Sequence, residues 1–127
     1  MNRFRNELFV ILPEAGNEGM FVFSNEQFGS IRTIVKNGEP WFVGVDVCKA
    51  LGIDPSAIRR IDEDEKITMR LTQCETNRTS DTTIINEPGL YTLVLGSRKP
   101  EARQFKRWIT HDVIPNIRKH GAYMTNN

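Results

Sequence analysis

The sequence predicts one small α+β domain made of β-hairpins, a helix-turn-helix-like pair and C-terminal helices. Three observations lead to this prediction. Strand-like alternation surrounds a two-residue turn at Asn37-Gly38, helical spacing begins near Val45, and helix signals recur from Asn86 to Gly121. A chain of 127 residues can bury one core but is short for two domains.

The segment Phe28–Val43 predicts a β-hairpin. Residues alternate between two faces from Ile31 to Lys36, and Asn-Gly favours a two-residue turn between antiparallel strands. Lys36 and Glu39 should then face each other beside the turn, where opposite charges help to fix the register. Pro40 fits a sheet edge or the start of a strand, because proline has no N–H to donate.

A pair of short helices is predicted at Val45–Leu51 and Pro55–Ile61. Gly52 breaks the first helix, and Asp54-Pro55 restarts the chain with an N-cap and a first-turn proline. The apolar spacing of the second helix leaves Arg59 and Arg60 on its outer side. A helix, a glycine-containing turn and a second helix outline a helix-turn-helix. The alternative is a purely structural pair of short helices with the same outline, in which Arg59 and Arg60 pair with the acids that follow them.

Those acids are the run 62–65. Two-metal chemistry needs carboxylates that converge from separate elements, so this run predicts a solvated turn and no metal site. Ile67, Met69 and Leu71 then alternate as a strand, which Thr82–Ile85 should return. The polar residues from Thr72 to Asp81 are expected to form a long exposed loop between these strands.

The run from Asn86 to Gly121 has the clearest helix signals. Asn86 can cap a helix that ends at Gly96. The apolar face of this helix comprises Leu90, Tyr91, Leu93 and Val94. Pro100 begins a second helix. Because Pro115 cannot sit deep inside a helix, we expect the second one to end near His111. A last short helix should start with Asp112 as its cap and stop before Gly121.

The second of these helices has an apolar side and a basic side, at about 100° per residue. The apolar side comprises Ala102, Phe105, Trp108 and Ile109. The basic side comprises Lys99, Arg103, Lys106 and Arg107. Packing the apolar side against a core would force the four cations outward together. The residues expected to be buried together are Trp41, Phe42, Leu51, Ile58, Leu90, Leu93, Phe105 and Ile109.

Charge is distributed unevenly along the chain. The formal net charge is only +1, but residues 97–119 contain seven Lys or Arg and two acids, a local charge of +5. Such a concentration favours an anionic partner. Basic residues that merely solvate a helix face would give the same pattern.

The chain resembles the N-terminal domain of the BRO family (Bro-N), found in phage and prophage antirepressors and in proteins of large DNA viruses. The resemblance lies in two blocks, Phe28–Ile53 (FGSIRTIVKNGEPWFVGVDVCKALGI) and Asn86–Gly121 (NEPGLYTLVLGSRKPEARQFKRWITHDVIPNIRKHG). It implies a small α+β domain that binds DNA and helps to control the lysogenic switch through transcription regulation. We place the overlap at Phe21–Met124, which divides the chain into an extension at 1–19, a Bro-N-like domain at 20–124 and a tail at 125–127.

The first nineteen residues lie outside this resemblance. Glu7–Leu12 could add a strand to the domain or belong to a flexible arm that carries Arg3 and Arg5. Because termini outside a sheet tend to be disordered, we expect Met1–Gly19 to be dispensable for folding.

Other chemistry is sparse in the sequence, so we expect no enzymatic activity, no cofactor and no metal. His111 and His120 lack the acids or cysteines of a zinc site. Cys48 and Cys74 form no C-x-x-C pair, which indicates reduced thiols in a cytoplasm, here that of a bacterial host cell. The chain has no apolar run near the ~20 residues that span a bilayer.

Two functions are consistent with these observations. In the first, the chain binds double-stranded DNA. Phosphates are then contacted by Lys99, Arg103, Lys106 and Arg107, and base edges by Arg59 and Arg60. In the second, it inactivates a phage repressor protein by direct contact without binding DNA. Either function allows a homodimer.

Overall fold

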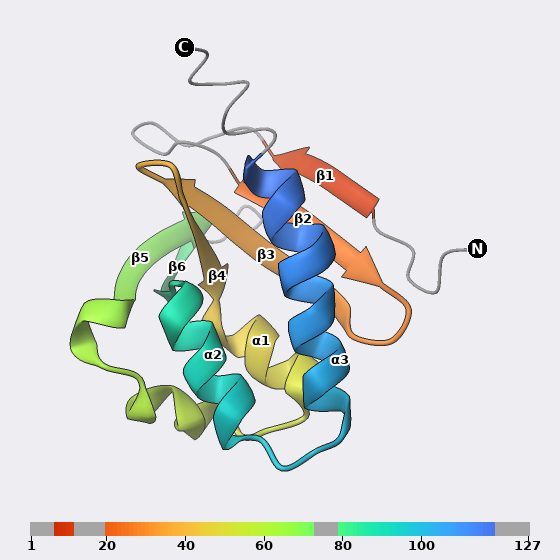
Figure 1. Cartoon of the computed structure of the whole chain (residues 1–127). Helices are drawn as coiled ribbons and strands as arrows, with labels where there is room; N and C mark the ends of the chain where they lie inside the picture. Colours follow the sequence, from red (N-terminus) through yellow and green to blue (C-terminus); the bar gives the residue numbers. More distant parts are fainter. Residues whose placement is uncertain (1–6, 12–19, 73–78, 119–127) are drawn as a thin grey trace.

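The computed structural model of the chain describes residues 7–11, 20–72 and 79–118 (Figure 1). Their strands are β1 (Glu7–Ile11), β2 (Met20–Asn25), β3 (Gly29–Lys36), β4 (Glu39–Val43), β5 (Lys66–Thr72) and β6 (Thr79–Ile85). Their helices are α1 (Gly44–Leu51), the 3-10 helices η1 (Pro55–Arg60) and η2 (Glu63–Glu65), α2 (Glu87–Gly96), α3 (Glu101–Trp108) and the π-helix η3 (Ile109–Val113).

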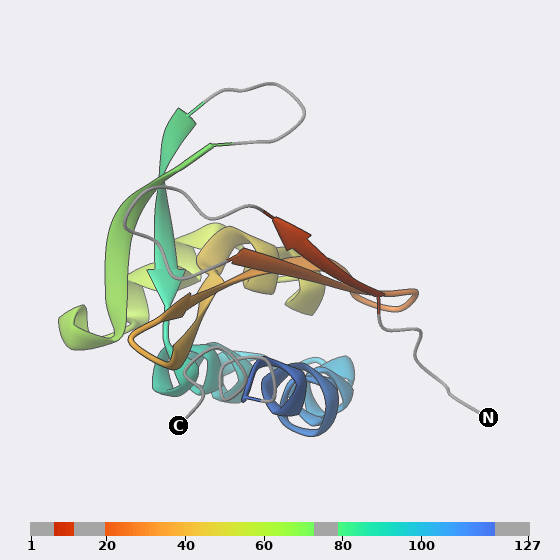
Figure 2. The same ribbon diagram turned by 90° about the horizontal axis from the view of Figure 1, so that it is seen from above.

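The strands form one antiparallel sheet in the order β1-β2-β3-β4-β6-β5. Helices α2 and α3 lie side by side on one face of this sheet, and the β5–β6 hairpin bends away from the plane of β2 and β3 (Figure 2). Helix α1 follows β4 directly and contacts both α2 and α3. This arrangement confirms the predicted α+β class.

The main core fills the space between the sheet and the helices, because strand residues alternate between two faces. Six of the eight residues expected in the core are buried together there: Phe42, Leu51, Leu90, Leu93, Phe105 and Ile109. Ile58 packs against this core but is only half-buried. Trp41 was placed wrongly, since it lies in a second cluster with Ile34, Val43 and Ile84. Neighbouring Phe42 and Trp41 therefore enter different clusters.

The predicted hairpin is confirmed in its turn and its register. Asn37 and Gly38 both have positive φ, 53° and 78°, as a two-residue turn between twisted strands requires. Lys36 pairs with Glu39. Pro40 sits near the start of β4, before pairing with β6 begins at Phe42.

The predicted helix caps are also confirmed. Gly52 ends α1 with φ 68°. The Asp54 carboxylate accepts a hydrogen bond from the Ser56 N–H at 2.8 Å, and the Asn86 side-chain oxygen accepts one from the Gly89 N–H at 3.0 Å. The helix that follows Asp54 ends within one residue of the predicted Pro55–Ile61, but it is a 3-10 helix, so the second member of the helix-turn-helix-like pair is not an α-helix.

The predicted break near His111 is wrong. Helix α3 continues through η3 into helical residues 114–118, so Asp112 does not cap a separate helix. In the π-helical segment the Ile114 N–H bonds to the Ile109 carbonyl, five residues back. This wider turn changes the hydrogen-bond pattern just before Pro115, which has no N–H.

Two further segments differ from expectation or settle an alternative. The loop expected at Thr72–Asp81 is shorter than predicted, because β5 extends to Thr72 and β6 begins at Thr79. The residues between them, 73–78, lie outside the described part of the chain. Residues Glu7–Ile11 pair with β2 as an edge strand, which favours the added strand over the flexible arm.

Among the described helices, none has the length and apolar character to cross a membrane.

Candidate nucleic-acid interface

Helix α3 holds three of the predicted cations on a fixed surface. Phe105 and Trp108 are completely buried on its inner side. The Phe28 ring meets the rings of Phe105 and Trp108 at centroid distances of 5.3 and 5.9 Å. Because these contacts fix the rotation of the helix about its axis, Arg103, Lys106 and Arg107 all project to solvent.

Lys106 also lies near α2. Its ammonium is 6.0 Å from the centroid of the Tyr91 ring, within range of a weak cation–π contact. The Tyr91 hydroxyl donates a hydrogen bond to Glu87 at 3.0 Å. Burial, followed by this bond to a carboxylate, raises the pKa of Tyr91 to about 12. The tyrosine therefore stays neutral at physiological pH and joins α2 to α3 at the edge of the cationic surface.

Lys99, the fourth predicted cation, precedes α3 and does not belong to the helix. Its ammonium lies 2.6 Å from the position that a Cβ on Gly52 would take. A side chain at position 52 would therefore displace Lys99. The ammonium sits beside Gly52 at the C-terminal end of α1, where the helix dipole favours a positive charge.

Arg60 is placed in a similar way at the end of α2. Its guanidinium lies 3.1 Å from the position that a Cβ on Gly96 would take. Arg59 and Arg60 are both exposed, and neither forms an ion pair with the acidic run among the described residues. The structure thus brings Arg60 to α2, but it does not present the two arginines on an α-helix.

The described ion pairs use other cations. They are Arg32–Asp46, Lys66–Glu63, Arg70–Asp81 and Arg118–Glu87. Within the described part of the chain, the six predicted DNA-binding residues therefore have no carboxylate partner. Their charges remain available to an external anion.

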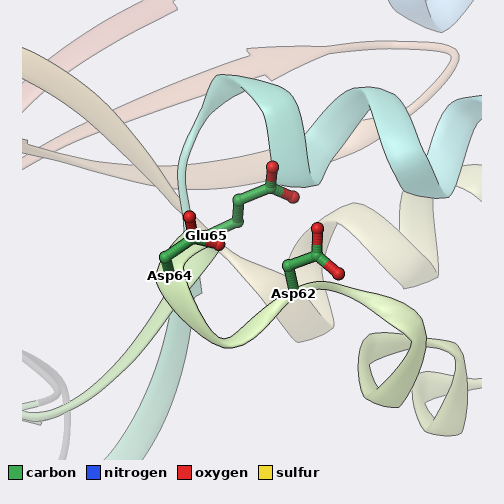
Figure 3. A group of neighbouring side chains, drawn as sticks. All are labelled: Asp62, Asp64 and Glu65. Atoms are coloured by element: carbon green, nitrogen blue, oxygen red, sulfur yellow. The ribbon is translucent and has the colours of Figure 1, made fainter.

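The acidic run lies at η2, beside the start of α2 (Figure 3). Asp62, Asp64 and Glu65 bring one carboxylate oxygen each to within 4.8 Å of one another, while Glu63 lies 3.7 Å from the Lys66 ammonium. Partial desolvation, followed by repulsion from the two aspartates, raises the pKa of Glu65. Three of the four acids therefore lie closer together than in the solvated turn expected from the sequence. Two of them, Asp62 and Asp64, are exposed, as that expectation requires.

Cys48 and His111, the other described side chains that could take part in chemistry, are a buried thiol and a surface imidazole bonded to its own helix. Cys48 is completely buried, and burial raises the pKa of its thiol. The His111 ring nitrogen Nδ1 lies 3.1 Å from the Arg107 carbonyl oxygen on the same helix, as expected for an exposed residue near a helix turn. The predictions for Cys74 and His120 lie outside the described residues.

Sequence spacing missed one feature of this surface. Leu95, on the outer side of α2, is 83% exposed. The apolar face predicted for α2 is buried at Leu90, Leu93 and Val94, which leaves Leu95 on the outer side, but no role was predicted for Leu95 from the sequence.

The fold and this surface define a small α+β domain with exposed cations on α3 and η1, the two elements that both contact α2. The model of the BRO family, N-terminal domain (Bro-N) matches residues 30–115, and the chain belongs to this family. The match begins within β3 and ends at Pro115, so it includes all of α2 and α3.

Relatives of the chain come from a bacterium and from large DNA viruses. A protein of Haemophilus influenzae is 43% identical over 88 residues, which cover 68% of this chain and 43% of the relative. A Bro-N domain-containing protein of Invertebrate iridescent virus 6 is 29% identical, over 66% of this chain and 25% of its own. One from Acanthamoeba polyphaga mimivirus is 29% identical, over 84% and 49% respectively. The chain thus spans less than half the length of these relatives. No solved structure matches it.

Proposed function

We propose that the chain is a double-stranded-DNA-binding module of an antirepressor-type transcriptional regulator, without enzymatic activity. The observation that carries the proposal is the placement of Arg103, Lys106 and Arg107. They are exposed on one side of a helix whose other side is fully buried, and they have no carboxylate partner among the described residues. Cations held in this way can each neutralise a DNA phosphate.

Arg59 and Arg60 flank the same surface from η1. A six-residue 3-10 helix is about 12 Å long, which is short for an element lying along a groove. Arg59→Ala decides between two roles. If Arg59 reads a base, the variant loses about 1–3 kcal/mol on the preferred site alone, whereas loss of a phosphate contact weakens binding to all sequences alike.

The test is a titration with duplex DNA at several salt concentrations. Each lost phosphate contact should lower the slope of log affinity against log salt by about one. We therefore expect Arg103→Ala/Arg107→Ala to lower the slope by about two. The matched control is Lys36→Ala/Arg70→Ala, which removes the same charge from β3 and β5 and should leave the slope nearly unchanged.

A second candidate function is contact with a phage repressor protein, which the exposed Leu95 side chain favours. Such a contact would have an apolar centre and a weak dependence on salt. Equal slopes for the Arg103/Arg107 variant, its control and the unmodified chain would select this candidate over DNA binding.

A further inference from the structure

The outer side of α2 is an uncharged stripe between two cationic sides. From Pro88 to Gly96 the helix contains no charged residue. Its solvent-facing residues are Pro88, Leu95, Gly96 and, partly, Tyr91 and Thr92. Leu95 protrudes the most, with 83% of its surface exposed.

Cations border this stripe on both sides from Tyr91 to Gly96, whereas its start at Gly89 lies against Glu65 of the acidic run. On the side of α3, the Lys106 ammonium lies over the Tyr91 ring. On the side of η1, the Arg60 guanidinium lies at Gly96, and Arg60 lines a small cavity with Thr92 and Leu93. The two cations thus approach α2 from different neighbouring elements, and the helix separates them. A helix with its side chains is about 10–12 Å wide, close to the ~12 Å width of the DNA major groove.

We infer that α2 is the element that faces the DNA groove, with Leu95 in apolar contact with base edges. This inference rests on the proposed function. Lys106 and Arg60 would then contact phosphates on the two strands that border the groove, and Leu95 would meet the thymine methyl group, the apolar group exposed in the major groove. At the end of α2 that carries Leu95, duplex DNA fits better than an apolar protein surface, because cations lie on both sides there and the acidic run lies at the opposite end of the helix.

The inference gives Arg60 a different role from the one that the sequence predicts. An arginine beside the groove-facing helix contacts the backbone, so its removal lowers the salt slope. Leu95 carries no charge, so its removal lowers affinity at every salt concentration without changing the slope. These two signatures separate the residues within one titration series.

The experiment compares Leu95→Ser with Val45→Ser on an alternating adenine–thymine duplex. Val45 is another exposed apolar side chain, at the start of α1. We expect Leu95→Ser to weaken binding about tenfold at an unchanged salt slope, and Val45→Ser to have no effect. On the same duplex with uracil in place of thymine, the loss caused by Leu95→Ser should shrink, because uracil lacks the methyl group.

Three results would overturn the inference. The first is unchanged affinity in Leu95→Ser while Arg103→Ala/Arg107→Ala still lowers the slope, which leaves the proposed function intact. The second is an equal loss on the thymine and uracil duplexes. The third is a change from dimer to monomer in Leu95→Ser by sedimentation, which would assign the stripe to a second copy of the chain. A salt slope that is unchanged in Arg103→Ala/Arg107→Ala would instead refute the proposed DNA binding itself.

Discussion

The two cationic sides of α2 are supported in different ways. Arg103 and Arg107 project from a helix whose inner side is completely buried through Phe105 and Trp108. Arg59 and Arg60 project from a 3-10 helix in which Ala57 is the buried residue. The core therefore places the α3 cations through two large buried rings, whereas the η1 arginines rest on one small buried residue and, for Arg60, on its approach to Gly96 of α2. If the chain binds DNA as proposed, the rigid placement of the α3 cations would favour a fixed register on the DNA backbone.

The largest expected effect comes from removing the support of α3. Phe105→Ala leaves a cavity among Phe28, Trp108 and their neighbours, and should lower the free energy of unfolding by about 3–5 kcal/mol. Ile58→Ala, next to the η1 arginines, removes a half-buried side chain and should cost clearly less. Chemical denaturation of both variants measures the difference. Equal losses would show that the two sides are supported alike.

A smaller effect is expected from the caps that begin the two regions. Asn86→Ala removes the cap of α2 and should cost about 1 kcal/mol at any pH near neutrality. Asp54, the cap of η1, has a lowered pKa because its carboxylate accepts the Ser56 N–H. Its contribution is therefore present above the ordinary pKa of 3.8 and is lost as the pH falls below it.

Thermal melts from pH 7 to acidic pH test this difference. The gap in melting temperature between the unmodified chain and Asp54→Ala should close in acid, whereas the gap caused by Asn86→Ala should not, because an amide does not titrate. A gap for Asp54→Ala that stays constant throughout would contradict the cap assignment.

The smallest effect is spectroscopic and concerns the junction of α2 with α3. The pKa of Tyr91 is about 12, so the phenolate absorbance of this residue should appear only in strong alkali. Glu87→Gln removes the charge that accepts its hydrogen bond and should lower the pKa of Tyr91 while burial keeps it above 10. Tyr91→Phe identifies the signal in the titration. An unchanged pKa in Glu87→Gln would mean that the bond does not hold the tyrosine.

Local chemistry explains which parts of the fold the sequence predicts. The turn at Asn37-Gly38 and the caps Asp54 and Asn86 are decided within a few residues, so they were predicted correctly. The same holds for the basic side of α3, because its two sides differ sharply in polarity. These features need no knowledge of distant contacts.

Other parts depend on information that spacing does not contain. Arg60 lies against Gly96, 36 positions away, and Lys99 lies against Gly52, 47 positions away. These contacts arise only when η1, α1 and α2 pack together. The buried face of α2 was predicted at Leu90, Leu93 and Val94, but spacing could not show which elements lie beside its outer side. Pro115 was expected to end the helix because that rule considers α-helical hydrogen bonds, whereas the chain uses a π-helical turn.

The proposed DNA-contact face is tested most directly by Arg103→Ala/Lys106→Ala/Arg107→Ala. These three residues lie outside the core, so circular dichroism and thermal melting should show a folded domain. If these cations contact phosphates, the salt slope of binding to duplex DNA should fall by about three, and affinity should drop for every sequence tried. Unchanged DNA affinity and slope in the folded triple variant would contradict it.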